Sequence, residues 1–320
     1  MKDRIVIVAG DPNSINSEII FKSFKKIKNN LKKKIVIIGN KNLLNDQLKL
    51  LKINLSLNNI SNINEISSNK SISIIDVPLY YKNSFKVSDK DASKYVKNSL
   101  SIAHNLSLKK KIKGFINCPI DKKLIKTKNV HGVTEYLAKK SKLTKYSEVM
   151  LLFNKTLSVV PLTTHIKIKD VSAKIRKSII IKKVRTINIY YKKIFKKMPK
   201  IAVLGLNPHN SELSKSSEEI RKIIPAIKIL KKNYKIFGPF AADSFFINQF
   251  KNFNVVLGMY HDQVLVPFKN IFKFDAINIT LGLKYYRISP DHGTAKDIIL
   301  KKKANAKSII ECINFMNKID

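Results

Sequence analysis

The stretch KIAVLGLNPH, residues 200–209, has a form that recurs along this chain of 320 residues: a short apolar run, then a polar loop. A run of Ile, Val and Leu of this length, bounded by Lys and by Asn-Pro, predicts a buried β-strand. Two comparable runs are LSVVPLTTH (157–165) and NVVLGMYH (254–261), and all three runs end in a histidine.

Similar runs alternate with longer, Lys-rich amphipathic segments along the whole chain. Buried strands that alternate with helices predict an α/β fold with mostly parallel sheets. The other predicted strands are residues 5–10, 34–39, 71–77, 114–120, 148–153 and 276–282, and the predicted helices are 16–32, 90–110, 178–197 and 216–232.

The composition predicts a cytoplasmic protein with no membrane partner. Hydrophobic residues make up 44% of the chain, as in globular proteins, and no run reaches the roughly 18 apolar residues of a membrane span. The first apolar run breaks at Gly10-Asp11-Pro12, which indicates a strand and not a signal peptide. Two cysteines, Cys118 and Cys312, make no disulfide framework and indicate a reducing compartment.

The net charge of +40 raises the possibility of a nucleic-acid-binding protein. However, the lysines occur on nearly every predicted helix instead of one stripe, and no arginine forks or aromatic platforms accompany them. We therefore expect weak attraction to polyanions and no specific nucleic-acid partner.

The three histidines at the ends of predicted strands are candidate metal ligands. Ligands of open α/β sheets bind beyond the carboxyl ends of the strands, and His165, His209 and His261 all stand there. Together they would form a three-nitrogen site suited to Zn²⁺ or a similar divalent cation. The alternative is that each histidine is an ordinary hydrogen-bonded loop residue.

The segment after the third of these histidines is rich in groups that bind anions. Lys269, Asn278 and Arg287 are candidates to hold a phosphate or carboxylate, although Lys269 is also explained as a solvated surface lysine. The loop DHGTAKD is a candidate for nucleotide contact through its backbone N–H groups. The chain contains no GxGxxG fingerprint or P-loop.

These motifs together resemble the 4-hydroxythreonine-4-phosphate dehydrogenase family of pyridoxal phosphate biosynthesis. The resemblance covers the chain from the first strand to about residue 298. The matching stretches are AGDPNSINSEII, NCPIDK, GVTEYLA, VPLTTHIKIKDV, GLNPHNSE, GPFAADSFF, YHDQVLVPFK and INITLGLKYYRISPDHGTAKDI.

The resemblance implies a role for each matched residue. It implies a divalent metal (Zn, Mg or Co) bound at the subunit interface of a homodimer by His165, His209 and His261. It also implies substrate contacts from Thr134, Lys269, Asn278 and Arg287, and contacts to NAD or NADP from His292, Gly293, Thr294 and Asp297. The general base is not identified. Asp243 is one candidate and a metal-bound hydroxide is another, although the position of Asp243 also suits a helix N-cap.

The resemblance further implies two α/β domains with a cleft between them, as in isocitrate and isopropylmalate dehydrogenases. Residues 1–133 plus 268–320 would form the cofactor side, and residues 134–267 the domain with the metal ligands and the dimer interface. The expected reaction is metal-assisted, NAD-dependent oxidation of 4-phosphohydroxy-L-threonine to 2-amino-3-oxo-4-phosphooxybutanoate, which decarboxylates to 3-amino-2-oxopropyl phosphate.

Two departures from the family pattern leave alternatives open. Ser14 and Asn16 replace glycines of the first loop, and of the two only Asn16 suits a left-handed backbone. Val133 replaces a histidine that contacts substrate, and His131 lies two residues out of register with it. The alternatives are therefore a paralogous dehydrogenase of another phosphorylated four-carbon hydroxy acid and, less favoured, a basic polyanion-binding protein without activity.

Overall fold

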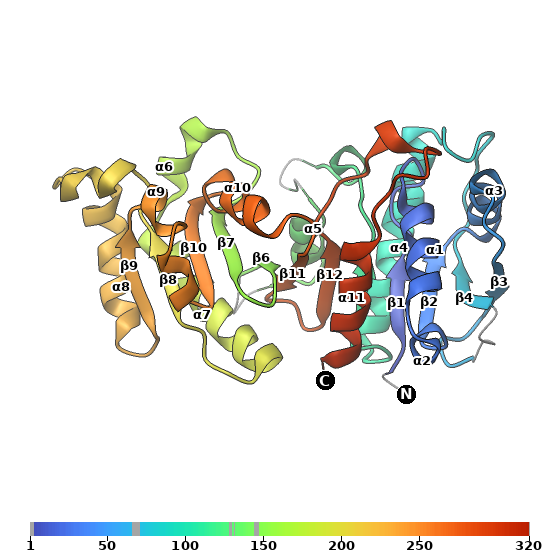
Figure 1. Ribbon diagram of the computed structural model, residues 1–320, viewed down its shortest axis with the longest axis horizontal. Coiled ribbons are helices and arrows are strands. Elements are labelled where there is room, and N and C mark those ends of the chain that lie inside the picture. The colour runs from blue at the N-terminus through green and yellow to red at the C-terminus, as the bar shows by residue number, and fades with distance from the viewer. Residues whose placement is uncertain (1–2, 66–70, 128–129, 131, 144–146, 320) are drawn as a thin grey trace. The chain divides into compact units, whose positions relative to one another are not determined.

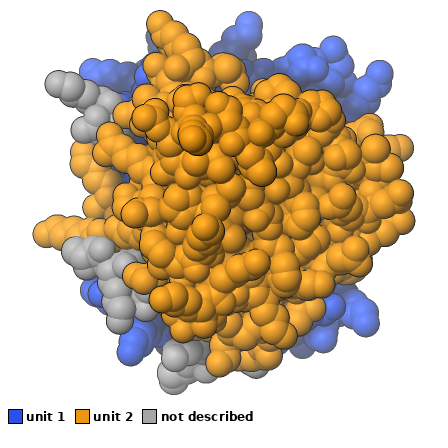
Figure 2. Space-filling model, turned by 90° about the vertical axis from the view of Figure 1, so that its left-hand side faces the viewer, with its two compact units in different colours: residues 1–137, 284–320 blue, residues 138–283 orange. Residues whose placement is uncertain are grey.

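The chain folds into two compact units in a computed structural model that describes residues 3–65, 71–127, 130, 132–143 and 147–319. Unit 1 comprises residues 1–137 and 284–320, and unit 2 comprises residues 138–283 (Figures 1 and 2). The boundaries expected from the sequence, after residues 133 and 267, fall earlier than these. Helix α5 (Val133–Lys140) spans the observed boundary after residue 137. Helix α10 (His261–Phe272) contains the expected boundary after residue 267, but it packs on strands of unit 2 and belongs to that unit as a whole.

Unit 1 contains a parallel sheet in the order β3-β4-β2-β1-β5-β12. Every residue of β1, β2, β5 and β12 is buried, so both faces of this sheet are covered. The strands are β1 (Ile5–Val8), β2 (Ile35–Gly39), β3 (Ser56–Asn59), β4 (Ser71–Asp76), β5 (Gly114–Asn117) and β12 (Tyr286–Pro290).

Helices from both ends of the chain cover the sheet of unit 1. α4 packs on β5, β1 and β2, whereas α11 packs on β12, β5 and β1 and also contacts α1 (Figure 1). The side chains of Asn40 and Ser88 cap α3 and α4 by accepting backbone hydrogen bonds in the first turn. The helices are α1 (Asn16–Lys26), α2 (Asn29–Lys32), α3 (Lys41–Leu51), α4 (Asp89–Leu108), α11 (Lys307–Lys318) and the 3₁₀ turns Lys122–Leu124 and Lys296–Ile298.

Unit 2 contains a mixed sheet in the order β11-β6-β7-β10-β8-β9. β6 is antiparallel to both of its neighbours, whereas β7, β10, β8 and β9 are parallel. The strands are β6 (Val149–Phe153), β7 (Ser158–Thr163), β8 (Ile201–Leu204), β9 (Ile236–Phe240), β10 (Val255–Tyr260) and β11 (Ile277–Leu281). The α/β fold predicted from the alternating pattern is confirmed.

Unit 2 has its own core of phenylalanine and aliphatic side chains, centred on Phe245, Phe268 and the inner faces of β7, β8 and β10. α10 packs on β7 and β10, α7 on β6, β7 and β11, and α8 on β9. The helices are α6 (Val171–Lys174), α7 (Lys177–Phe195), α8 (Ile224–Lys231), α9 (Ala242–Phe245), α10 (His261–Phe272), the π-helix Glu219–Ile223 and the 3₁₀ turns Ile168–Asp170, Pro208–Leu213 and Gln249–Asn252.

Two expectations about the environment of the chain can be compared with the described residues. No helix among them is both long and apolar enough to cross a membrane. Cys118 and Cys312 are both buried free thiols, as expected from the small number of cysteines.

Candidate active site

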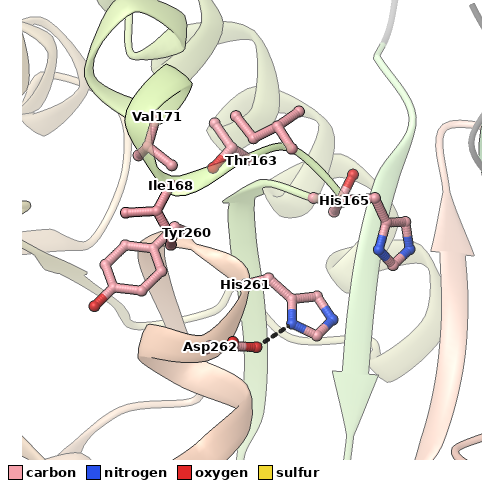
Figure 3. A pocket seen from close by; sticks show the side chains of 9 residues that line it. Thr163, His165, Ile168, Val171, Tyr260, His261 and Asp262 are labelled. Atoms are coloured by element: carbon pink, nitrogen blue, oxygen red, sulfur yellow. Dashed lines mark hydrogen bonds and ion pairs between the residues drawn. The ribbon is translucent and has the colours of Figure 1, made fainter.

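A pocket of about 190 Å³ opens in unit 2 where two parallel strands end (Figure 3). β7 and β10 are neighbours, and Thr163 of β7 pairs with Tyr260 of β10. The residues that follow these two positions therefore reach the same edge of the sheet. The lining residues are 163–166, Ile168, Val171 and 260–262.

Two of the three predicted metal ligands meet at this pocket. The ring centroids of His165 and His261 are 5.5 Å apart, with the ring planes tilted by 41° (Figure 3). The Nδ1 atom of His261 lies 2.6 Å from Oδ1 of Asp262. A carboxylate on one ring nitrogen fixes the tautomer and leaves the other nitrogen for a cation, so these side chains fit part of a divalent metal site.

His209, the third predicted ligand, does not line the pocket. β8 ends at Leu204, and the chain then enters a turn in which His209 to Leu213 all have positive φ angles, between 47° and 57°. Left-handed backbone costs roughly 1–2 kcal/mol per non-glycine residue. Among the described residues, no three His, Cys, Asp or Glu side chains are close enough to hold a metal ion. One chain therefore brings together two of the three predicted ligands, His165 and His261.

Two glutamates hold the start of the His209 loop. Oε1 of Glu219 accepts hydrogen bonds from the backbone N–H groups of Leu206 at 2.7 Å and Asn207 at 2.9 Å. The Asn207 side chain donates to both Glu218 and Glu219, and Glu218 also accepts from Ser172. Burial alone would raise the pKa of Glu219, but the hydrogen bonds from Asn207 and Leu206 outweigh it and lower this pKa.

Gln263 connects the loop after β8 to the end of β10. Its Nε2 donates to the Gly205 carbonyl at 2.7 Å, and its Oε1 accepts from the Met259 N–H at 2.7 Å. Gln263 follows His261 by two residues, so one amide side chain joins the loop that carries His209 to the helix that carries His261.

Three further predicted site residues also lie in unit 2. Lys269 is exposed in the last turn of α10. Asn278 lies on β11, and no described residue hydrogen-bonds its buried Oδ1. Asp243 is exposed in the first turn of α9 and does not line the pocket. The helix begins at Ala242 with Ala241 as its N-cap, so the N-cap interpretation of Asp243 is wrong.

Unit 1 brings together Thr134 and Arg287, which are 153 residues apart in the sequence. Arg287 lies on β12 and is only 3% exposed. Its Nε donates to Oδ1 of Asn117 at 2.6 Å, and its Nη1 donates to Oγ1 of Thr134 at 3.3 Å. Burial lowers the pKa of Arg287 to about 10, and the nearby Glu135 carboxylate acts in the opposite direction. The guanidinium therefore stays charged at neutral pH.

The DHGTA loop follows β12 and meets two other loops of unit 1. The strands β1, β5 and β12 are adjacent and parallel, so the loops after them share one edge. The Ile15 N–H donates to the Thr294 carbonyl at 3.2 Å, and Lys296 forms an ion pair with Asp121 at 2.7 Å. Apart from Gly293 itself and its two neighbours in the chain, no described atom lies within 4 Å of where a Cβ would stand on this residue. The backbone at Gly293 is therefore uncrowded.

The other predicted cofactor residues are arranged along the same loop. His292 directs its Nδ1 toward the Gly293 carbonyl, 3.0 Å away. Asp297 is exposed in the 3₁₀ turn Lys296–Ile298.

The first loop does not need the glycines that it lacks. Neither Ser14 nor Asn16 has a positive φ angle, so this loop does not use the left-handed backbone that Asn16 alone of the two would suit. Oγ of Ser14 donates to the Asp11 carbonyl at 2.6 Å and accepts from the Asn16 N–H at 3.2 Å. Nδ2 of Asn16 donates to the Pro119 carbonyl at 2.8 Å. Polar side chains thus stabilise the turn that leads into α1.

The second departure lies at the start of α5. Val133 is the first residue of this helix and is partly exposed, and Thr134 follows it in the first turn. His131 lies outside the described residues.

Several supporting residues were not predicted from the sequence, among them Asn117, Glu219 and Gln263. Asn117 is the last residue of a buried strand. The argument that ligands bind at the carboxyl ends of strands, applied to polar residues as well as to histidines, would have predicted it. Nothing in the spacing of Glu219 or Gln263 indicates their partners, because those hydrogen bonds join loops that only the fold brings together.

The parallel strands, with polar loops at their carboxyl ends, define an α/β protein whose polar residues gather where its strands end. Isocitrate dehydrogenase from Methylococcus capsulatus shares the fold, with a TM-score of 0.50 and 12% identity over 98% of this chain and 84% of that one. The isocitrate-dehydrogenase-like fold predicted from the resemblance is confirmed.

The sequence matches the family "Pyridoxal phosphate biosynthetic protein PdxA" over residues 31–316, and the chain belongs to that family. The 4-hydroxythreonine-4-phosphate dehydrogenase of Sulfurihydrogenibium sp. (strain YO3AOP1) is 39% identical over 318 residues, 97% of this chain and 96% of the relative. The family resemblance and the oxidoreductase class predicted from the sequence are thereby confirmed.

Two further proteins bear on the substrate. The crystal structure of 4-hydroxythreonine-4-phosphate dehydrogenase from Klebsiella pneumoniae has a TM-score of 0.85 and 29% identity over 99% of both chains. A relative from Oceanobacillus iheyensis carries the provisional name D-threonate 4-phosphate dehydrogenase and is 30% identical over 98% of this chain and 96% of the relative.

Proposed function

We propose that this protein oxidises 4-phosphohydroxy-L-threonine to 2-amino-3-oxo-4-phosphooxybutanoate, which decarboxylates to 3-amino-2-oxopropyl phosphate, with NAD or NADP as hydride acceptor. The observation that carries the proposal is the pair of imidazoles, His165 and His261, with Asp262 beside them at the ends of two parallel strands. Family membership adds independent support.

The metal site in this proposal uses His165, His261 and His209, and the cation is Zn²⁺, Mg²⁺ or Co²⁺. When bound, a divalent cation polarises the substrate hydroxyl and favours its deprotonation. Asp262 holds the His261 ring in one orientation. One chain brings two imidazoles together, His165 and His261. A metal site at a subunit interface would take its remaining ligand from the other subunit, so the proposal includes a homodimer in which a second copy supplies His209.

The anionic groups of the substrate are bound by Arg287 and Thr134, together with Lys269 and Asn278. A buried guanidinium offers planar, charge-assisted hydrogen bonds to a phosphate or carboxylate. The buried Oδ1 of Asn278 provides an acceptor for a substrate N–H or O–H donor. Fixing both ends of a small substrate sets the reacting carbon relative to the hydride acceptor.

The dinucleotide lies against the DHGTA loop in this proposal, in contact with His292, Gly293, Thr294 and Asp297. The uncrowded backbone at Gly293 supports close approach of a large ligand. The general base is not assigned, and Asp243 stays a prediction. We also place the protein in the cytoplasm.

A second candidate function is oxidation of another phosphorylated four-carbon hydroxy acid, such as D-threonate 4-phosphate. Val133 favours it, because an aliphatic side chain stands next to Thr134 where the family motif has an imidazole. The relative from Oceanobacillus iheyensis also supports it. The two substrates differ in one substituent, an amine or a hydroxyl, so a changed contact near Thr134 can decide between them.

The test is reduction of NAD or NADP, followed by absorbance, with purified protein and added Co²⁺, Mg²⁺ or Zn²⁺. Faster turnover of 4-phosphohydroxy-L-threonine supports the first function, and faster turnover of D-threonate 4-phosphate supports the second. A chelator-treated sample is the control for metal dependence. Turnover of neither substrate, combined with salt-sensitive binding of DNA, would favour the polyanion-binding alternative.

A further inference from the structure

Arg287 has a buried partner to which the proposed function gives no role. The Nε of this buried guanidinium donates to Oδ1 of Asn117 at 2.6 Å, which is short for an N–H···O hydrogen bond. All five N–H groups of arginine lie in one plane. A partner that fixes the Nε–H group therefore fixes the direction in which the other four N–H groups point.

Asn117 is itself held firmly. It is the last residue of β5, is 2% exposed, and donates from Nδ2 to the Cys118 carbonyl at 3.2 Å. Arg287 pairs with Phe115 on β5, so Asn117 stands two residues further along on the same face of the sheet. With its Nδ2 directed to a carbonyl, the amide presents Oδ1 to Arg287.

The orientation imposed in this way aims the guanidinium at the start of α5. The Nη1 atom donates to Oγ1 of Thr134, so Asn117 and Thr134 hold two edges of the same planar group. Because Asn117 is neutral, it orients the cation without adding a negative charge that would compete with an incoming anion.

We propose that Asn117 is a positioning residue that orients Arg287 toward a phosphate or carboxylate group of the substrate. This inference rests on the proposed function, because it assigns Arg287 to substrate binding. Asn117 touches the arginine, so its loss is expected to act through Arg287.

A double-mutant cycle separates positioning from a general effect on folding. Asn117→Ala is expected to raise KM for 4-phosphohydroxy-L-threonine by about tenfold or more with a smaller change in kcat. In an Arg287→Lys background, which lacks the Nε–H group, the same change is expected to raise KM less than about threefold. An equal rise in both backgrounds would overturn the proposal. Asn188→Ala removes another buried asparagine, on α7, and serves as the matched control.

Asn117→Asp tests the importance of a neutral partner. It keeps an acceptor for the Nε–H group but places a negative charge against the guanidinium, so we expect a larger rise in KM than for Asn117→Ala. A smaller rise would contradict the argument that neutrality matters. Melting temperatures of all variants show whether a loss of activity reflects unfolding.

A readout that needs no turnover distinguishes failure of this inference from failure of the proposed function. If the unaltered protein oxidises none of the substrates, the proposed function fails, and NMR of the arginine side chains decides the role of Asn117. Asn117→Ala is then expected to shift the Arg287 Nε–H signal and speed its exchange with solvent. An unchanged signal would overturn the positioning role.

Discussion

The candidate sites of the two units differ in how far their functional side chains are buried. In unit 1, Arg287 is almost fully buried and makes hydrogen bonds from Nε and Nη1. In unit 2, His165 is exposed, His261 is partly exposed, and the third predicted ligand stands apart on a left-handed turn. The buried arginine finds hydrogen-bonding partners within its own chain. The exposed imidazoles, in contrast, are accessible to a ligand and to a second subunit.

The largest expected effect tests the histidine site of unit 2. His209→Ala and His261→Ala are each expected to abolish turnover and Co²⁺ binding, measured by Co²⁺ absorption spectroscopy, because a lost imidazole leaves too few ligands. Near-normal turnover of either variant would remove that histidine from the metal site.

Mixed dimers sharpen the same comparison. If His165 and His261 come from one subunit and His209 from the other, re-associated His209→Ala and His261→Ala chains form one intact site per mixed dimer. Random mixing should then restore roughly a quarter of the normal activity. A mixture of His165→Ala and His261→Ala chains is the matched control and should stay inactive. Equal restoration in both mixtures would show that the histidines are divided differently between the subunits.

The arginine site of unit 1 is tested by Arg287→Ala. Loss of a buried charged hydrogen-bonding partner typically costs about 2–5 kcal/mol, or roughly 30- to 4,000-fold in kcat/KM. Steady-state kinetics measures this effect. Arg185→Ala, at an exposed position of α7, should change kcat/KM little. A fall of less than about tenfold for Arg287→Ala would argue that the anion binds elsewhere.

A smaller effect is expected from Glu219→Gln, which tests what holds the His209 loop. Replacing the Glu219 carboxylate with an amide places an NH₂ donor against the side-chain NH₂ donor of Asn207. This contact between two donors should lower the free energy of unfolding by about 1–3 kcal/mol. Because hydrogen bonds lower the pKa of Glu219, its contribution is complete above the ordinary value of 4.5 and is lost as pH falls through the folded-state pKa. Denaturant unfolding measured from neutral pH to well below 4.5 should therefore show a weaker pH dependence in the variant.

The control for this measurement is Glu212→Gln, an exposed residue of the same loop. The same acid sensitivity in Glu219→Gln and in the unaltered protein would show that other carboxylates govern the acid range, Glu218 first among them, since its pKa is also lowered by Ser172 and Asn207.

The smallest expected effect concerns the first loop. Asn16→Gly restores the residue of the family pattern but removes the hydrogen bond to the Pro119 carbonyl and adds backbone freedom to the unfolded chain. We expect about 1 kcal/mol of destabilisation, or a melting temperature lower by about 2–4 °C. Calorimetry checks it, and a higher melting temperature would show that the loop prefers glycine after all.

The sequence predicted well those features that depend on local pattern. The strands before His165, His209 and His261 follow from apolar runs with clear ends, and neighbouring parallel strands then bring two of these histidines together. The position of His209 depends on a five-residue left-handed turn without glycine, which no propensity favours.

The supporting contacts were the hardest to predict. The bond between Asn117 and Arg287 joins residues 170 positions apart, and its geometry depends on sheet register, not on sequence spacing. The N-cap predicted at Asp243 is wrong because the helix α9 begins before this residue, at Ala242, although aspartate is a good capping residue.

The discontinuity of unit 1 has a consequence for synthesis of the chain on the ribosome. β5 gains its neighbour β12, and with it Arg287, only when residues 286–290 have been made. Unit 2, residues 138–283, is continuous and is translated in between. At about 5–20 residues per second, that interval lasts roughly 7–30 seconds. During this time the buried edge of β5 lacks its partner strand, so newly made unit 1 should be the part most in need of chaperone protection.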